Sequence, residues 1–428
     1  MVNQILVPII STCAIVLALV ETEIANATRP HNTEPVTFRA DHTFLVNGRP
    51  FFPLGLYYCA EEFEDPSGKL LQELKGYGFN TAGYYRYGNP SWREELDRAH
   101  RLGLKVWVRG HNGFALDTPA AEKAALDQVR NLREHPALLI WEFEDEPLYN
   151  KVSIAAARKG HALVKREDPH HPLLTVEWPG AVHRLAEWKG LGDVFAVDLY
   201  PIPRSRGYGR LPNKDITQMR DYLAALRAAH GEKPFLLVLQ AWAWEPLKDG
   251  AKGYPTPHEN RFMAYQAVIH GAKGLFYYGQ LRCTRPNPAA ALASASKEPQ
   301  VQQTEFARCQ ELNRAFWTAH RPLFRELSQA TALFVLEDAP ATRTLVASPA
   351  VTALEGRTKQ QGAHLYHLVV NASDQPQRVT YQLPPGVRAA TIHVLFEGRT
   401  LPVANGTFTD EFRPYDVHVY ATTSDLPR

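Results

Sequence analysis

The chain has 428 residues and a formal net charge of +2, from 47 Lys and Arg residues against 45 Asp and Glu residues. This near-neutral balance, with no long run of one sign, excludes the charge pattern of a nucleic-acid-binding or anionic-membrane-binding protein. The length exceeds the roughly 250 residues of one α/β barrel, so it predicts one large domain with a smaller domain appended.

The chain opens with an apolar stretch from Ile5 to Val20, followed by the small-residue triplet Ala25-Asn26-Ala27. An apolar run of this length is short for a membrane-spanning helix, and the triplet fits a signal-peptide cleavage site. Residues 1–27 are therefore predicted to be a secretory signal, although no Lys or Arg precedes the apolar run; a membrane anchor is the alternative. A secreted or periplasmic location follows, with no membrane span after cleavage.

Residues 37–52 have the pattern of a β-hairpin with Asn47-Gly48 as its turn. Apolar strands then alternate with amphipathic helices. The predicted strands are 52–58, 79–85, 104–109, 138–144, 173–177, 194–199, 235–239 and 274–278. The predicted helices include 92–102, 120–133, 154–167, 216–229 and 259–270. Eight apolar strands separated by helices predict a (β/α)8 TIM barrel, assigned to residues 28–330.

From about residue 331 the helical period disappears. Short β-rich runs follow, separated by the turn sequences Pro384-Pro385-Gly386 and Asn405-Gly406. These runs are 363–371, 377–382, 390–396 and 417–420. They predict a C-terminal antiparallel β-sandwich over residues 331–428.

The cysteines and histidines give no indication of a metal or another cofactor, because no pair of them has ligand spacing. In an oxidising compartment Cys283 and Cys309 could form a disulfide across the loop between them. Cys59 would then remain as a buried thiol on a strand.

The fourth predicted strand ends in Glu144, Asp145 and Glu146, followed by Pro147. Catalytic groups of a parallel barrel lie at the C-terminal ends of its strands. In a cleft of low dielectric constant, the pKa of a carboxyl can rise far enough for acid catalysis. Solvated or ion-paired acids at a strand end are the structural alternative. Asp145 and Glu146 are the leading catalytic candidates.

Other predicted strand ends carry aromatic, amide and carboxylate side chains. Sugar rings combine apolar C–H faces with polar hydroxyl rims, so this mixture suits a carbohydrate ligand. Any single aromatic residue is better explained by packing than by ligand binding, but packing explains poorly their recurrence at one end of the barrel. The candidate substrate-binding residues are Tyr85, His111, Asn112, Trp178, Tyr200 and Trp242.

Three segments resemble the clan A glycoside hydrolases. Residues 46–52 resemble the entry to their barrel, and residues 135–141 with Asp145-Glu146-Pro147 look like their fourth strand. Residues 412–420 are similar to the β-domains that follow such barrels. The resemblance implies that Glu146 is the acid/base residue, with Asp145 in place of the usual Asn.

Retaining members of that clan carry a nucleophilic glutamate at the end of the seventh strand. In this chain the corresponding position is Gln240. An amide cannot form the ester bond of a glycosyl-enzyme intermediate. The resemblance therefore predicts the acid but leaves the second catalytic group open.

Two interpretations keep hydrolysis within the barrel mouth. In the first, Glu146 is the acid and Asp145 polarises a 2-acetamido sugar whose own carbonyl is the nucleophile. In the second, Glu146 is the acid of an inverting enzyme. Gln240 would then hold a water molecule that Asp198 or Glu177 activates.

Two further interpretations remain open. Glu245, a short way beyond the seventh strand, could fold back as the nucleophile. Alternatively, the barrel binds glycans without cleaving them. Asp198 could also serve only to cap the loop that begins at Pro201. Glycosidic hydrolysis with Glu146 as proton donor is the leading prediction, and a carbohydrate is the predicted partner.

Overall fold

The computed structural model describes residues 35–85, 92–110, 116, 118–283, 299–348 and 350–427. The predicted signal segment and the candidate residues His111 and Asn112 lie outside these ranges. Within them, no helix has the length and apolar character needed to cross a membrane.

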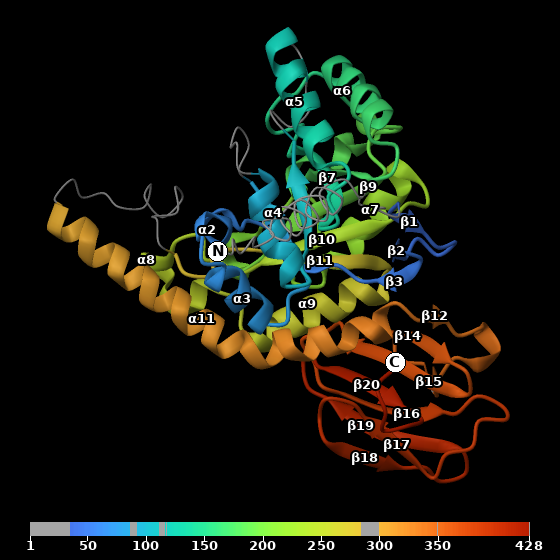
Figure 1. Ribbon diagram of the computed structural model, residues 1–428. Coiled ribbons are helices and arrows are strands. Elements are labelled where there is room, and N and C mark those ends of the chain that lie inside the picture. Colours follow the sequence, from blue (N-terminus) through green and yellow to red (C-terminus); the bar gives the residue numbers. More distant parts are fainter. Residues whose placement is uncertain are drawn as a thin grey trace, which may run out of the picture.

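Eight parallel strands form a closed barrel in which neighbours in space are neighbours in sequence (Figure 1). In barrel order from the first, the strands are β4 (Leu54–Leu56), β5 (Thr81–Tyr84), β6 (Lys105–Arg109), β7 (Leu138–Asp145), β8 (Leu173–Glu177), β9 (Val194–Leu199), β10 (Phe235–Gln240) and β11 (Ala272–Tyr278). The prediction of a (β/α)8 barrel is confirmed. All eight predicted strands overlap the observed ones.

Helices surround the barrel. The five predicted helices correspond to α4 (Trp92–Arg101), α5 (Pro119–Leu132), α6 (Ile154–Glu167), α7 (Gln218–His230) and α9 (Pro257–Ile269). The structure adds shorter helices: α2 (Ala60–Glu64), α3 (Lys69–Gly76), α8 (Pro246–Asp249), η2 (Pro179–Trp188), η3 (Arg204–Arg206) and η4 (Gly250–Gly253).

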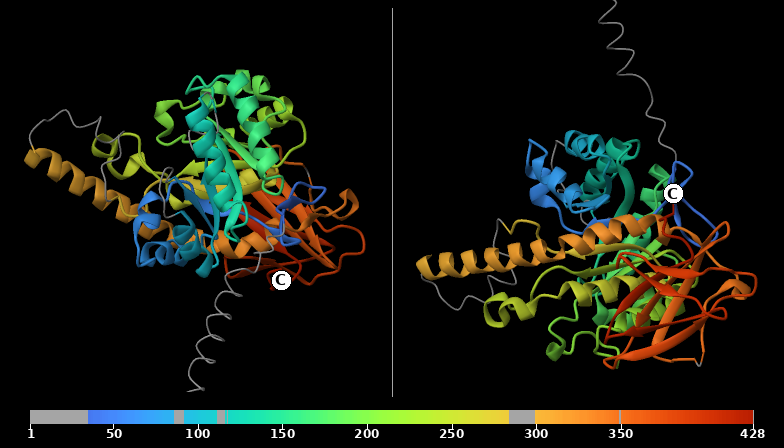
Figure 2. Two further views of the ribbon diagram at one scale, coloured as in Figure 1. Left: turned by 45° about the horizontal axis from the view of Figure 1, so that its top comes forward. Right: turned by 90° about the horizontal axis from the view of Figure 1, so that it is seen from below.

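The long helix α11 (Pro299–Phe334) leads from the barrel to the β-domain, and its first turns extend beyond the barrel (Figure 2). The sequence did not predict this helix. Pro322 lies inside it, and an internal proline argues against a continuous helix because it removes one backbone hydrogen bond. Packing compensates, since Trp317, Phe324 and Leu327 are buried against the barrel.

The strands are buried on both faces, as their nearly continuous apolar sequences require. On β10, Leu236 and Val238 point into the barrel interior, whereas Leu237 and Leu239 pack in the core beneath the helices. Because side chains alternate along a strand, each strand serves both cores. The two cores fix the strand ends, and hence the groups that these ends carry.

A small antiparallel sheet precedes the barrel. Its strands are β1 (Thr37–Phe38), β2 (Phe44–Val46) and β3 (Arg49–Phe51). The predicted turn residues Asn47 and Gly48 both have positive φ, 53° and 70°, as a type I′ hairpin turn requires. Phe44 packs in the same cluster as the barrel interior, so this hairpin covers the N-terminal end of the barrel.

The C-terminal part contains two antiparallel sheets, as predicted. The six-stranded sheet consists, in spatial order, of β12 (Glu337–Asp338), β14 (Leu354–Gln361), β15 (His364–Asn371), β20 (Val417–Ala421), β17 (Thr391–Val394) and β18 (Arg399–Pro402). The three-stranded sheet consists of β13 (Val346–Ala347), β16 (Gln377–Gln382) and β19 (Thr407–Phe412). The short helix η5 (Ala341–Arg343) precedes β13. One apolar cluster, with Val369, Tyr381 and Phe408, contains side chains of both sheets. The domain is therefore a β-sandwich.

The β-domain packs against the barrel mainly through α9 (Figure 1). Glu355 on β14 accepts hydrogen bonds from Gln266 (2.8 Å), His270 (2.8 Å) and Arg220 of the barrel. Burial alone would raise the pKa of Glu355, but these three donors outweigh it and hold the pKa below its ordinary value. The interface thus depends on an ionised carboxylate with donors from two barrel helices.

Candidate active site

The C-terminal end of the barrel carries a cluster of acids centred on β7. The register between β7 and β8 shifts between Glu142 and Glu144, so β7 contains a β-bulge. A bulge inserts one residue and re-aims the side chains that follow it. As a result, Glu142 and Asp145 meet the same phenol, that of Tyr57, at the barrel interior.

Glu142 is fully buried within the barrel. Its carboxyl accepts hydrogen bonds from Tyr57 (3.2 Å) and from Tyr85 (2.7 and 2.8 Å). Burial, together with the negative charge of Asp145, raises the pKa of Glu142 to about 8 despite these donors and nearby Arg109. Glu142 therefore carries a proton for much of the time at neutral pH.

Arg109, at the end of β6, connects the acids of β7. Its guanidinium lies 3.0 Å from Asp145 and 3.7 Å from both Glu142 and Glu144. Burial opposes the positive charge, but the surrounding acids outweigh it and raise the pKa of Arg109. Asp145 also accepts a 2.7 Å hydrogen bond from Tyr57. Two donors thus fix the orientation of the Asp145 carboxylate.

Glu146 follows β7 with a strained backbone, since its φ is 47°. Few residues other than glycine adopt this region, and such strain is often found at functional sites. Its backbone N–H donates to the carbonyl of Val176 at 2.7 Å. Burial, and then the charge of Asp145, raises the pKa of Glu146 to about 7, while hydrogen bonding with Asp198 and the charge of Arg109 lower it. The carboxyl is half-buried and suited to proton transfer at neutral pH.

Asp198 lies on β9 and is buried. Its Oδ2 accepts a 3.1 Å hydrogen bond from Tyr200, while Oδ1 has no donor among the described residues when the neighbouring carboxyls are ionised. Burial, followed by the charges of Glu146 and Asp145, raises the pKa of Asp198 well above its ordinary value. A proton held between Asp198 and Glu146 gives both carboxyls a hydrogen bond.

Glu177, at the end of β8, holds the loop that follows β7. Its Oε1 accepts a 3.2 Å hydrogen bond from the backbone N–H of Leu148. Burial, with the charges of Glu146 and Asp145 among the smaller causes, raises the pKa of Glu177 to about 8. The side chain of Glu177 therefore hydrogen-bonds to the loop after β7, which follows directly from Glu146.

Gln240 ends β10 and binds backbone groups on two sides. Its Nε2 donates to the carbonyls of Ile202 (2.8 Å) and Trp242 (2.9 Å), and its Oε1 accepts from the N–H of Ile202 at 2.9 Å. Both amide hydrogens are thus used. This geometry joins the loop after β9 to the loop after β10, and a direct catalytic role of Gln240 stays a prediction.

Aromatic side chains border the acids on the side of β9 to β11. Trp242 lies 5.6 Å from Tyr200 and 4.5 Å from Trp244, measured between ring centroids. Trp178 lies apart from this group, 5.4 Å from Tyr149. The structure therefore brings together Tyr85, Tyr200 and Trp242 around the acids and places Trp178 beside the loop after β7.

Glu245 lies at the rim, not among the buried acids. Its carboxylate is 3.8 Å from Arg206 and 3.2 Å from Lys248, and 42% of the side chain is exposed. A solvated, doubly paired carboxylate has no environment that favours covalent catalysis. Among the described residues, no three His, Cys, Asp or Glu side chains are grouped to hold a metal ion.

The sequence missed two groups at the centre of this site. Glu142 lies within the predicted fourth strand, before its acidic end. Side chains two residues apart on a strand share a face, so the inward-facing Ile140 was a signal that Glu142 also points into the barrel. Tyr57 lies near the end of the first predicted strand, where the same rule for strand ends would have selected it. The bulge that joins Glu142 to Asp145 has no sequence signal in this strand.

Comparison with known proteins identifies the fold. Neither protein-family models nor curated proteins match the chain. Among solved structures it is similar to a glycoside hydrolase at 14% identity and a TM-score of 0.58, covering 92% of this chain and 97% of that one. A family 5 glycoside hydrolase from Bacteroides vulgatus gives 15% identity and a TM-score of 0.60, with 91% and 93% covered. The structure of AmyP in complex with maltose is similar at 13% identity and a TM-score of 0.51, and the match covers 85% of this chain and 91% of that one.

At these identities the similarity is one of fold. The chain has the (β/α)8 barrel of the glycoside hydrolases, as its fourth-strand resemblance implied, with a β-domain at its C-terminus.

The hydrogen bonds of Gln240 predict the effect of Gln240→Glu. A carboxylate has no donor for the carbonyls of Ile202 and Trp242, so we expect a loss of about 2–4 kcal/mol in the free energy of unfolding. Thermal and urea unfolding measure this loss. Gln72→Glu on the exposed face of α3 is the matched control and is expected to change stability by less than about 0.5 kcal/mol. Equal stability of the two variants would contradict the clamping role of Gln240.

Proposed function

We propose that this chain is a glycoside hydrolase in which Glu146 donates a proton to the leaving oxygen. The observation that carries the proposal is the half-buried Glu146 carboxyl at the barrel mouth, whose pKa is raised to about 7 by burial and by Asp145. A general acid is most effective when its pKa lies near the working pH. The shared barrel fold of solved glycoside hydrolases supports this reaction class.

A carbohydrate fits the surroundings of Glu146 better than a purely apolar or ionic ligand. Trp242 and Tyr278 are partly exposed and pack against the buried ring of Tyr200, so their rings can offer faces for C–H groups. The acids and phenols beside them offer partners for hydroxyl groups. AmyP, one of the solved structures with this fold, has been seen with maltose, and we extend only the general ligand class, a saccharide, to this chain.

The contact between Glu146 and Asp198 bears on the mechanism. Hydrogen-bonded carboxyls lie closer together than the roughly 5–5.5 Å of retaining pairs or the 6.5–9.5 Å of inverting pairs. Asp198 is therefore too close to Glu146 to match either kind of catalytic pair, and it is better placed to share the proton of the acid. It is poorly placed to activate water from the opposite side.

Asp145 is then the carboxylate best suited to assist Glu146. Tyr57 and Arg109 orient it with contacts of 2.7 and 3.0 Å, and a quarter of its side chain is exposed to the mouth. It can accept a hydrogen bond from an N–H group of the substrate. This arrangement favours substrate-assisted hydrolysis of a 2-acetamido sugar over the inverting and Glu245 mechanisms.

Glycan binding without hydrolysis is the second candidate. It is favoured by Gln240, whose amide occupies the usual position of a nucleophile and is already bonded to backbone groups. The candidates differ in one observable, the release of a reducing sugar.

The first test compares two single variants, Glu146→Gln and Glu245→Gln, with the original chain by measuring turnover of a panel of oligosaccharides and p-nitrophenyl glycosides. Loss of the general acid is expected to lower kcat by about 10²–10⁴. Glu245→Gln is expected to keep turnover close to that of the original chain. Turnover that survives Glu146→Gln would contradict the acid assignment, and turnover lost only in Glu245→Gln would transfer the catalytic role to the rim. Absence of turnover with retained glycan affinity would support the binding candidate.

The second test uses pH. Because the acid works only when protonated, kcat/KM is expected to fall as pH rises above about 7. Asp145→Asn removes a negative charge that raises the pKa of Glu146, so ionisation becomes easier and the alkaline limb should move to lower pH. Asp374→Asn, on the exposed surface of the β-domain, should leave the limb in place. A limb unmoved or moved upward by Asp145→Asn would contradict the assigned coupling.

A further inference from the structure

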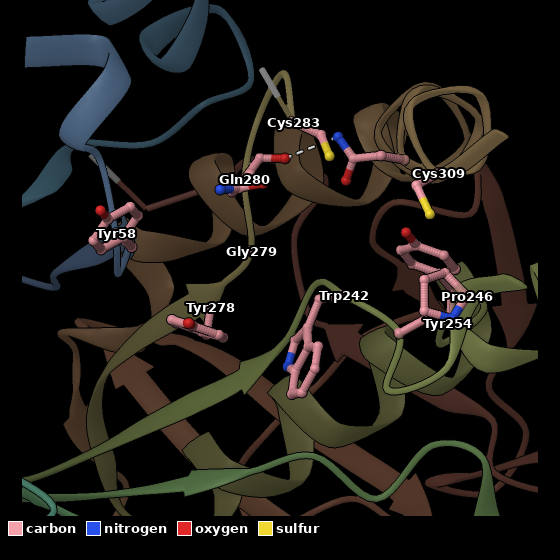
Figure 3. A pocket seen from close by; sticks show the side chains of 11 residues that line it. Tyr58, Trp242, Pro246, Tyr254, Tyr278, Gly279, Gln280, Cys283 and Cys309 are labelled. Carbon is pink, nitrogen blue, oxygen red and sulfur yellow. Dashed lines mark hydrogen bonds between the residues drawn. The ribbon is translucent and has the colours of Figure 1, made fainter. Parts of the chain in front are cut away.

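On the side of β10 and β11, the barrel mouth contains a cavity of about 230 Å³ (Figure 3). Trp242 and Tyr278 line this cavity. Both rings pack against Tyr200, whose hydroxyl donates a hydrogen bond to Asp198 at 3.1 Å. Cavities that enclose drug-sized ligands occupy roughly 300–1,000 Å³, so this smaller cavity has room for one sugar ring and not for an oligosaccharide.

Helix α11 borders the same cavity. Cys309 and Asn313 of this helix line it together with Cys283. Cys283 and Cys309 are free cysteines, so the disulfide that the sequence allowed is not formed. Asn313 donates a 2.9 Å hydrogen bond to the backbone carbonyl of Gln280, which connects the helix to the chain beyond β11. An oligosaccharide at Glu146 must therefore place its further rings elsewhere on the mouth.

The loop that follows β7 lies at the opposite edge of the mouth. Strands β7 and β11 are four places apart in the closed barrel of eight strands, so this loop and Tyr278 face each other across the acids. The N–H groups of Glu146 and Leu148 donate to acceptors on β8, at 2.7 and 3.2 Å. These bonds fix the loop and hold the next residue, Tyr149, beside the proton donor.

Tyr149 and Trp178 form an exposed aromatic pair at this edge. Tyr149 is 59% exposed, and among the described residues it is the only Phe, Tyr or Trp in the exposed class. Its ring meets the ring of Trp178 edge to face, with 5.4 Å between the ring centroids. Trp178 directly follows β8 and is itself partly exposed. Two adjoining rings offer an apolar surface to the C–H face of a sugar.

Gly180 keeps the ring of Trp178 in this position. A Cβ at Gly180 would overlap the six-membered ring of the indole, so the ring occupies space that only a glycine leaves free. The φ angle of Gly180 is not positive, and its backbone therefore does not itself require glycine. The missing side chain thus serves the Trp178 ring. A ring that is oriented before a ligand arrives lowers the entropic cost of binding.

We propose that Tyr149 and Trp178 form a sugar-binding platform for a second ring of the ligand, while the first ring lies against Trp242 and Tyr278. The acids, Glu146 among them, lie between the two aromatic groups. The ligand is accordingly an oligosaccharide bound across the barrel mouth, not a single sugar. The inference rests on the proposed function for its ligand class, because the acid site between the platforms makes a saccharide the expected occupant.

Binding to the Glu146→Gln variant tests the platform without any need for turnover. Isothermal titration calorimetry compares glucose, mannose and N-acetylglucosamine with cellotriose, maltotriose, mannotriose and tri-N-acetylchitotriose. We expect at least one trisaccharide to bind about tenfold more tightly than its monosaccharide, because only the longer ligand reaches the second pair of rings. The ratio of these two affinities is the length preference.

Tyr149→Ala and Trp178→Ala, each made in the Glu146→Gln background, should lower the affinity for that trisaccharide about tenfold. The monosaccharide binds at the other aromatic group, so its affinity should stay the same. Val346→Ala is the matched control, because it removes a similarly exposed apolar side chain (57%) from the β-domain. It should leave the length preference unchanged.

Gly180→Ala tests the platform without removing either ring. Its methyl group should displace the Trp178 indole and weaken trisaccharide binding several-fold, whereas monosaccharide binding should persist. Gly76→Ala at the end of α3 is the matched control, since a Cβ there meets no atom within 4 Å. Thermal unfolding verifies that each variant is folded. If Gly180→Ala does not fold, Tyr149→Ala at the exposed position still decides the proposal.

The outcomes separate the platform from the hydrolytic proposal. Absence of binding by every member of the panel, equal affinity for trisaccharides and monosaccharides, or a length preference that survives Tyr149→Ala or Trp178→Ala would overturn the platform, even if turnover that depends on Glu146 is observed. A length preference that both alanine variants abolish would establish the platform even if no glycan is ever cleaved.

Discussion

The site depends on an imbalance of charge at the barrel mouth. Six carboxyls gather there, and among the described residues Arg109 is the one cation that forms ion pairs with any of them, namely Glu142, Glu144 and Asp145. The cluster consists of Glu142, Glu144, Asp145, Glu146, Glu177 and Asp198. Burial and repulsion between the carboxyls raise the pKa of Glu142, Glu144, Glu146, Glu177 and Asp198, so several of these five retain protons at neutral pH. Acid catalysis by Glu146 is one consequence of this shared constraint.

The barrel holds these acids together although their repulsion opposes it. The bulge in β7 aims Glu142 and Asp145 at one phenol, and the backbone of Glu146 adopts a strained φ of 47°. Two apolar cores, one inside the barrel and one beneath the helices, fix the strands that carry these groups. The packing of the two cores thus offsets the repulsion and backbone strain at the barrel mouth, and this keeps the proton-donating carboxyls in position.

Much of the fold follows from the sequence because the apolar runs of strands and the amphipathic pattern of helices are local properties of the sequence. The strand ends that carry Asp145, Asp198 and Gln240 were predictable for this reason. The bulge was not, since it arises from pairing between β7 and β8. The partners of Gln240 were also hidden because they lie in loops, and so was helix α11, because only tertiary packing stabilises it. The roles of the individual site residues remain predictions.

The protonation of Glu146 can be measured without a substrate. Chemical shifts of ¹³C-labelled glutamate carboxyls are followed from pH 4 to pH 9 in the original chain and in Glu146→Gln. The account predicts a carboxyl that titrates near pH 7 in the original chain and is absent from the variant. A Glu146 signal that titrates at the ordinary glutamate value of about 4.3 would contradict it.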